Sequence, residues 1–182
     1  LAMAEFALAG IMHFAKGLPQ AAVDYDAGKF SHRAYNPLLL SDKNVCVVGA
    51  GGIGQDVGRL CSAMGMRVLG TRGSQNDEPT PQGFDFVGHP GELDRLLVDA
   101  DFVAICCQWT PETNHLFNTE RFSFMKPGSI LVNVARGEII EETAKKSRKI
   151  GKFRRKIRSK VHGAFLHPVR RRGRRFCASV GY

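Results

Sequence analysis

A glycine-rich run near the middle of the chain has the residue types and spacing to bind phosphate through its backbone. The run GAGGIG contains Gly49, Gly51, Gly52, Ile53 and Gly54 and matches G-x-G-x-x-G. The three motif glycines permit a tight turn, a close approach of the backbone to a pyrophosphate, and close packing of a helix on a strand. An ordinary strand-to-helix turn is the alternative. An apolar run before the glycines and a helical pattern after them favour dinucleotide binding.

The choice between NAD and NADP is expected to lie at the end of the second strand, where an Asp or Glu would bind the ribose 2′-hydroxyl of NAD. This chain has Thr71, Arg72 and Ser74 there instead. An Arg accommodates a 2′-phosphate, and the two hydroxyl groups can donate hydrogen bonds to it. A solvated surface Arg is the alternative. The pattern predicts a preference for NADP, with NAD as a possible second cofactor.

The segments that would position these residues alternate between strand and helix patterns. Apolar runs predict strands at 44–49, 67–70, 84–87, 101–107 and 129–134, and helical patterns fall at 56–65, 91–98 and 119–125. Near-continuous apolar strands separated by helices are typical of a parallel sheet covered on both faces. We therefore predict an α/β fold with a doubly wound parallel sheet of the Rossmann type, incomplete at its C-terminal end.

The predicted organisation has four parts. Residues 1–20 have the apolar spacing of an amphipathic helix, which we favour over a signal peptide. Residues 21–42 form a connector, residues 43–142 a dinucleotide-binding domain, and residues 143–182 a basic tail. We expect that tail to lack regular structure or to be out of register with the sequence of the family that the domain resembles. Because the first residue is Leu rather than Met, we also expect the chain to begin inside a longer one.

Charge is distributed unevenly along the chain. Of 26 Lys and Arg residues, 15 lie in 143–182, which holds no acidic residue, whereas all 17 Asp and Glu residues lie in 1–142. Such a tail can bind polyanions such as RNA, but it interleaves few aromatic residues, and an extension without function is the favoured interpretation.

Five cysteines without metal-ligand spacing argue against a zinc module or disulfide scaffold. No uncharged apolar stretch reaches the roughly 18 residues of a membrane span.

Several segments together resemble one family. VVGAGGIGQDVGRLCSAMGMRVLGTR at 47–72, TPET at 110–113 and MKPGSILVNVARG at 125–137 are similar to the nucleotide-binding domain of the D-isomer-specific 2-hydroxyacid dehydrogenases. This family includes phosphoglycerate dehydrogenases and glyoxylate/hydroxypyruvate reductases. The resemblance covers about residues 2–142. It implies an oxidoreductase that reduces a 2-keto acid to a D-2-hydroxy acid by hydride transfer from NAD(P)H.

The resemblance also implies roles for individual residues. Arg136 matches the arginine that holds the carboxylate and carbonyl of the substrate, and its planar, permanently charged fork suits that role. Val134 and Ala135 match residues that line the nicotinamide, and Cys107 matches a position beside the cofactor. Trp109 departs from the family pattern, and we expect it to pack its own loop rather than cover the adenine.

Two catalytic partners of the family are missing from this sequence. In the family, a Glu tunes a His that exchanges the substrate proton. No acidic residue follows Glu142, and neither His162 nor His167 stands in the Pro-His pattern of the family. We hypothesise that the chain is a partial gene product, or that a frame slip occurs after about residue 143. We expect this chain alone to be inactive.

The N-terminal helix resembles the one that crosses between the two domains of the family. Without a second domain it would expose Phe6, Ile11 and Phe14, a surface for dimerisation or aggregation. The intact protein is expected to be a homodimer that acts on small 2-keto or 2-hydroxy acids. With no targeting signal visible, a cytoplasmic location is the default. A non-catalytic nucleotide-binding module is the alternative function, although an NAD sensor would be expected to carry an acidic residue in place of Arg72.

Overall fold

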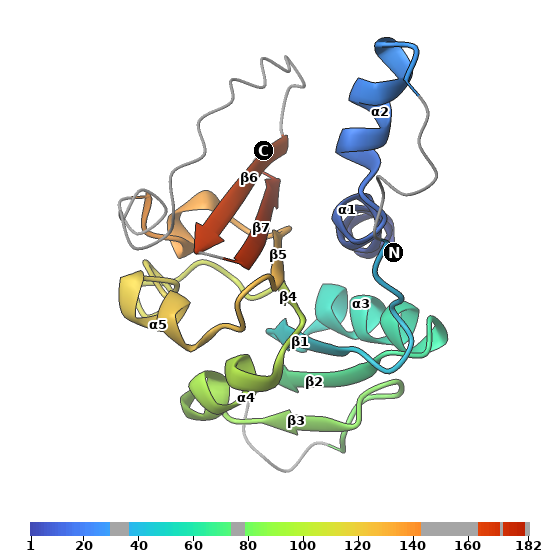
Figure 1. Cartoon of the computed structure of the whole chain (residues 1–182). Coiled ribbons are helices and arrows are strands. Elements are labelled where there is room, and N and C mark those ends of the chain that lie inside the picture. Colours follow the sequence, from blue (N-terminus) through green and yellow to red (C-terminus); the bar gives the residue numbers. More distant parts are fainter. Residues whose placement is uncertain (30–36, 74–78, 143–163, 172, 181–182) are drawn as a thin grey trace.

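The computed structural model describes residues 1–29, 37–73, 79–142, 164–171 and 173–180. The described strands form one sheet in the order β3-β2-β1-β4-β5-β7-β6 (Figure 1). The first five strands of the chain are mutually parallel: β1 (Asn44–Val48), β2 (Arg67–Thr71), β3 (Phe86–Gly88), β4 (Phe102–Ile105) and β5 (Ile130–Asn133). Each lies within two residues of a predicted strand, so the predicted doubly wound parallel sheet is confirmed.

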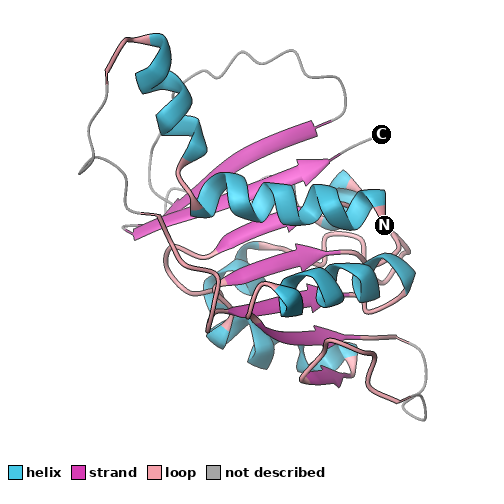
Figure 2. Ribbon diagram, turned by 90° about the vertical axis from the view of Figure 1, so that its right-hand side faces the viewer, coloured by secondary structure: helices cyan, strands magenta, loops and turns pink. Residues whose placement is uncertain are grey.

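Helices cover both faces of this sheet because its central strands are apolar on both sides. α1 (Ala2–Ala15) and α3 (Gly52–Ala63) lie across one face (Figure 2), and α4 (Leu93–Asp99) and α5 (Thr119–Phe124) cover the other. Successive strand residues point to opposite faces. Val45 and Val47 therefore join the cluster under α1 and α3, whereas Cys46 joins the one under α4 and α5. The strands pack on both faces, as parallel sheets require.

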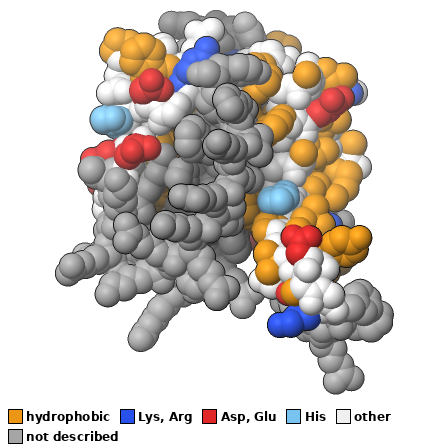
Figure 3. All heavy atoms as spheres, turned by 90° about the horizontal axis from the view of Figure 1, so that it is seen from above, with side chains coloured by type: hydrophobic (Ala, Val, Ile, Leu, Met, Phe, Trp, Pro, Cys, Tyr) orange, Lys and Arg blue, Asp and Glu red, His pale blue; other side chains and the backbone are white. Residues whose placement is uncertain are grey.

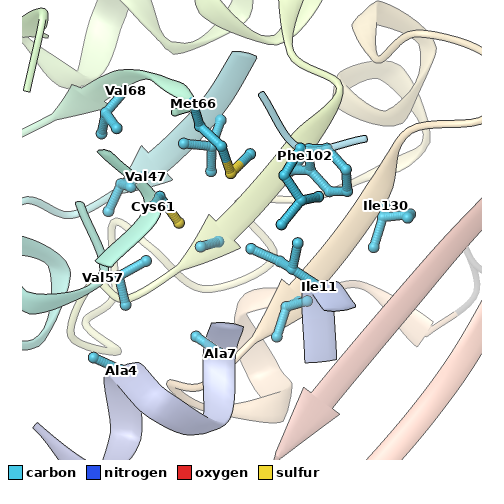
Figure 4. Packing of buried hydrophobic residues seen from close by; sticks show 14 of the residues in the cluster. Ala4, Ala7, Ile11, Val47, Val57, Cys61, Met66, Val68, Phe102 and Ile130 are labelled. Atoms are coloured by element: carbon cyan, nitrogen blue, oxygen red, sulfur yellow. The ribbon is translucent and has the colours of Figure 1, made fainter. Parts of the chain in front are cut away.

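Helix α1 packs on the sheet, and this contact buries its apolar face without a second domain. Ala4, Ala7, Ile11 and Ala15 recur every three or four residues and are buried. Small residues at this spacing let the helix approach α3 and β5 closely, and Figure 4 shows Ala4, Ala7 and Ile11 facing the core. The expectation that Ile11 is exposed was wrong. Of the other two, Phe14 packs partly against the cluster.

A second helix occupies the start of the expected connector. α2 (Leu18–Asp26) begins after Gly17, whose φ of 67° turns the chain out of α1, and Pro19 lies in its first turn. No residue of α2 is buried, and the helix projects away from the sheet (Figure 2). Its low apolar content explains why the sequence resembles a connector here. Seen from above, hydrophobic side chains gather along the right-hand side of the molecule (Figure 3), the side on which α1 and α2 lie in Figure 1.

Two further strands lie within the basic segment. β6 (Ala164–Arg171) and β7 (Gly173–Val180) form an antiparallel hairpin, and β7 pairs in parallel with β5. These two stretches form regular strands, so the first alternative, a lack of regular structure, does not hold for their backbone; the second, that the segment is out of register with the family, stays a prediction. β5 would otherwise present an unpaired edge, and a strand added there satisfies its backbone groups. None of the described helices is long and apolar enough to cross a membrane.

Candidate dinucleotide site

The glycine-rich turn joins β1 to α3 with almost no space between the two. Gly49 has a φ of 96°, and a Cβ at this position would lie 2.6 Å from the backbone N and Cα of Cys107. A Cβ at Gly54 would lie 2.0 Å from the carbonyl oxygen of Gly49. Real side chains do not tolerate such contacts, so both positions require glycine. The turn thus brings the first turn of α3 directly over the end of β1.

The first turn of α3 is open to an anion. Gly51 is its N-cap, no side chain caps the helix, and no acidic residue lies in its first turn. The first N–H groups of a helix have no partner within it. A Cβ at Gly51 or Gly52 would meet nothing within 4 Å. The sequence leaves free space beside unpaired donors and the positive end of the helix dipole, which is what a pyrophosphate needs.

The end of β2 lies against this turn. The carbonyl oxygen of Thr71 accepts from the backbone N–H groups of Gly49 at 3.0 Å and Ala50 at 2.8 Å. Arg72 follows, half-buried, and its backbone N–H donates to the carbonyl of Gly88 at 3.0 Å. The backbone of Arg72 is thereby fixed beside the glycine turn. Ser74, the third residue predicted to contact the cofactor here, lies outside the described residues.

The segment after β4 forms the opposite wall of the turn. The N–H of Cys106 donates to the carbonyl of Val48 at 2.8 Å, so the chain leaves β4 alongside β1. Burial raises the pKa of the Cys107 thiol to about 11 and also raises the pKa of Cys106. Both thiols are therefore neutral at pH 7 and do not repel phosphate.

Trp109 contacts its own loop through one edge of its ring and is otherwise exposed. The side chain is 51 % exposed, and its indole N–H donates to Oδ1 of Asn114 at 3.2 Å. Thr113 closes the same loop by donating from its hydroxyl to the carbonyl of Gln108 at 2.8 Å. The hydrogen bond directs the polar edge of the indole ring into the loop and leaves half of the ring in contact with solvent.

The residues after β5 complete this edge of the sheet. Val134 is buried, and its N–H donates to the carbonyl of Ile105 at 3.1 Å. Ala135 is half-buried, whereas Arg136 is exposed and donates from Nη1 to the carbonyl of Ala135 at 3.1 Å. Parallel strands place their carboxyl ends at one edge. The structure therefore brings the glycine turn, Thr71, Arg72 and the segment 134–136 to the same edge, with a guanidinium after β2 and another after β5.

One polar residue at this edge was missed by sequence reasoning. Asn133 ends β5 and is fully buried, with its side-chain amide bonded to the loop that carries Arg136. Its only signal in the sequence is a polar residue at the end of the apolar run SILV.

Other parts of the described chain offer little competing chemistry. A hollow of about 290 Å³ lies away from the glycine turn, by the start of β2 and the end of α4. It is lined by Arg67, Leu69, Asp85, Phe86, Arg95, Leu96 and Asp99. No three His, Cys, Asp or Glu side chains gather as metal ligands among the described residues.

Comparison with protein families identifies the domain. Residues 8–146 match the model described as D-isomer specific 2-hydroxyacid dehydrogenase, NAD binding domain. The chain belongs to this family. The match spans the glycine turn and the segment after β5, so the domain is a nicotinamide dinucleotide-binding one.

Individual relatives support the same assignment. The chain is 35 % identical over 145 residues to D-3-phosphoglycerate dehydrogenase 2, chloroplastic, from Arabidopsis thaliana, covering 79 % of this chain and 23 % of the relative. It is 33 % identical over 151 residues to glyoxylate reductase from Thermococcus onnurineus, covering 79 % and 44 %. A solved D-isomer-specific 2-hydroxyacid dehydrogenase from Xanthobacter autotrophicus, in complex with NADPH and MES, matches with a TM-score of 0.68 and 25 % identity, covering 78 % and 57 %. The chain thus spans less than half the length of the two curated relatives.

Proposed function

We propose that this domain binds NADP in preference to NAD, with Arg72 contacting the 2′-phosphate of the adenine ribose. The main support for this proposal is the position of Arg72, which follows β2 directly beside the glycine turn. Its backbone N–H donates to the carbonyl of Gly88, and the sequence has no acidic residue at this position. A carboxylate there would bind a ribose hydroxyl and repel a phosphate, whereas a guanidinium attracts it. Thr71 and Ser74 flank Arg72 and supply hydroxyl groups. The Xanthobacter relative, solved with NADPH, is consistent with this proposal.

The pyrophosphate would lie over the first turn of α3. Gly49, Gly51, Gly52, Ile53 and Gly54 would contact it through backbone atoms, because Gly51 and Gly52 leave open space there. The nicotinamide would lie toward β4 and β5, near Cys107, Val134 and Ala135. The bound cofactor supplies hydride chemistry, and the residues of this chain orient it.

The proposed reaction of the longer parent protein is reduction of a small 2-keto acid to a D-2-hydroxy acid. Arg136 would bind the carboxylate of the substrate and polarise its carbonyl, because its guanidinium is exposed at the edge where the nicotinamide would lie. The Thermococcus relative is named for glyoxylate. The family resemblance implies a Glu that tunes a proton-transferring His, and no acidic residue follows Glu142 in this sequence. We therefore propose that these residues alone bind the cofactor and leave the substrate unreduced.

Titration of the purified chain with NADPH and separately with NADH, followed by nicotinamide fluorescence, tests this proposal. We expect NADPH to bind at least about tenfold more tightly than NADH, because a charged phosphate–Arg contact contributes about 1.5–3 kcal/mol. Arg72→Gln should abolish the difference while leaving NADH binding unchanged. Equal affinities in the unaltered chain would refute the NADP preference, and no binding of either nucleotide would refute the proposed site.

Assembly and location are also proposals. We propose that the intact protein is a homodimer. Its interface includes the exposed apolar side chains of α2, among them Leu18, Val23 and Tyr25. Sedimentation of the purified chain should show a dimer that Val23→Glu dissociates; a monomer at all concentrations would contradict this. A cytoplasmic location stays a prediction, since the Arabidopsis relative is described as chloroplastic.

A further inference from the structure

Asn133 uses both ends of its side-chain amide on the two residues that follow Val134. Oδ1 accepts from the backbone N–H of Ala135 at 2.9 Å, and Nδ2 donates to the backbone carbonyl of Arg136 at 2.8 Å. The side chain is fully buried. A buried amide with both ends satisfied fixes its partners more strongly than an exposed one, because no water competes for them.

These two bonds replace the sheet ladder where the chain leaves it. The N–H of Val134 still bonds to Ile105 of β4, but Ala135 and Arg136 lie beyond the strand. The side chain of Asn133 therefore holds the backbone of Ala135 and Arg136 in place, although neither residue has a hydrogen bond of the sheet. To bond both the N–H of Ala135 and the carbonyl of Arg136, a side chain needs one acceptor and one donor on the same carbon, as an amide has. A carboxylate would serve the N–H and repel the carbonyl, and Leu would serve neither.

The loop held in this way is the one from which Arg136 projects. Arg136 has φ −134° and ψ 147° at the start of η2 (Gly137–Ile139). Its guanidinium is exposed and bonds to the carbonyl of Ala135. The direction of an exposed Arg is determined mainly by the backbone that carries it, so a shift of this loop moves the guanidinium relative to the nicotinamide. Ligand binding depends steeply on such displacements.

We propose that Asn133 is a positioning residue, whose two hydrogen bonds hold Ala135 and Arg136 in the arrangement that binds the carboxylate of a 2-keto acid. The inference rests on the proposed role of Arg136. It assigns to Asn133 no contact with substrate or cofactor. Its effect passes through the backbone of the following loop.

Asn133→Asp gives a test that separates hydrogen bonding from space filling. When protonated, the substituted carboxyl group has one O–H donor and one acceptor oxygen, as the amide has; when ionised, it has acceptors only. Burial disfavours the ionised form and raises the pKa of such a group toward the accessible range. The variant should therefore regain function as the pH falls. Asn133→Leu, of similar size, cannot.

The measurement is the affinity of the NADP⁺-saturated chain for oxalate, a planar dicarboxylate probe, between pH 5.5 and pH 8. Relative to the unaltered chain, Asn133→Asp should bind oxalate about tenfold more weakly at pH 8, the loss expected for one broken buried hydrogen bond, and should recover at pH 5.5. Asn133→Leu should be weak at both. Adenosine 2′,5′-bisphosphate, which would occupy the Arg72 side of the site, should bind all three chains equally and so reports that the variants are folded.

The unaltered chain corrects for other titrating groups near Asn133. These are Cys107 after β4, on the face of the sheet toward which Asn133 points, and Glu138 in η2 with His115, whose backbone N–H donates to the carbonyl of Glu138; Ser179, the register partner of Asn133 on β7, does not titrate. A pH-independent Asn133→Asp, or an Asn133→Leu that binds oxalate normally, would overturn the role of Asn133. If the unaltered chain binds NADPH but not oxalate, the role of Arg136 fails and the inference fails with it, while the dinucleotide site stands.

Discussion

The carbonyl oxygen of Gly49 lies where a side chain on Gly54 would have to stand, 2.0 Å from the position of its Cβ. This contact joins the end of β1 to the first turn of α3 without an intervening side chain. It is the reason that two glycines five residues apart belong to one structural unit. Any enlargement of Gly54 must move the helix whose N-terminus we propose binds the pyrophosphate.

Gly54→Ala should destabilise the domain and weaken dinucleotide binding together. The added methyl group collides with backbone, which cannot rotate away, so we expect a loss of about 2–3 kcal/mol in the free energy of unfolding. Gly52→Ala is the matched control, because a Cβ there meets nothing within 4 Å. Urea unfolding of both variants measures the difference. Equal stability of the two variants would show that the helix can shift freely.

Ile11→Ala should destabilise the chain by about 3 kcal/mol, because Ile11 is fully buried between α1 and the sheet and its removal leaves a cavity. Phe6 lies on the same helix but is 39 % exposed, so Phe6→Ala should cost less, about 1 kcal/mol. Thermal unfolding compares them. If Phe6→Ala lowered the free energy of unfolding more than Ile11→Ala does, α1 would pack on a different face from the one described.

Stability should fall as the pH rises above about 9. Burial raises the pKa of the Cys46 and Cys61 thiols to about 12, whereas in the unfolded chain these thiols ionise near pH 8.5–9. Their contribution is complete below that range and is lost progressively as the pH approaches 12. Each such thiol steepens the fall by about 1.4 kcal/mol per pH unit. Urea titrations at pH 8, 9 and 10 should show a shallower decline for Cys46→Ala; an unchanged slope would argue that this thiol is accessible to water.

Trp109 should report nucleotide binding. It is the only Trp of the chain, it is half exposed, and it lies two residues after Cys107, whose backbone adjoins the glycine turn. We expect NADPH to quench its emission, both by contact and by energy transfer to the reduced nicotinamide. Quenching by adenosine 2′,5′-bisphosphate alone would place the adenine near the ring. Unchanged emission at a saturating NADPH concentration, known from nicotinamide fluorescence, would place Trp109 away from the cofactor.

The strand–turn–helix unit could be predicted because its signals are local. An apolar run, glycines at set positions and a helical period lie next to one another, and the contacts at Gly49 and Gly54 explain them. The burial of Ile11 could not be predicted in this way, because what α1 packs against is decided by strands more than thirty residues later in the chain. The role of Asn133 was missed for a related reason. A single polar residue after a strand acquires meaning only from the loop that folds back onto its amide.

The most direct test of the proposed site is amide hydrogen exchange of the chain with and without NADPH. We predict that NADPH protects the N–H groups of Gly52, Ile53 and Gly54 at the start of α3, together with those after β2 and after β5. Amides of the hollow near Arg67 and Asp99 should not change. Protection confined to that hollow or to the basic segment, with the first turn of α3 unaffected, would contradict the account.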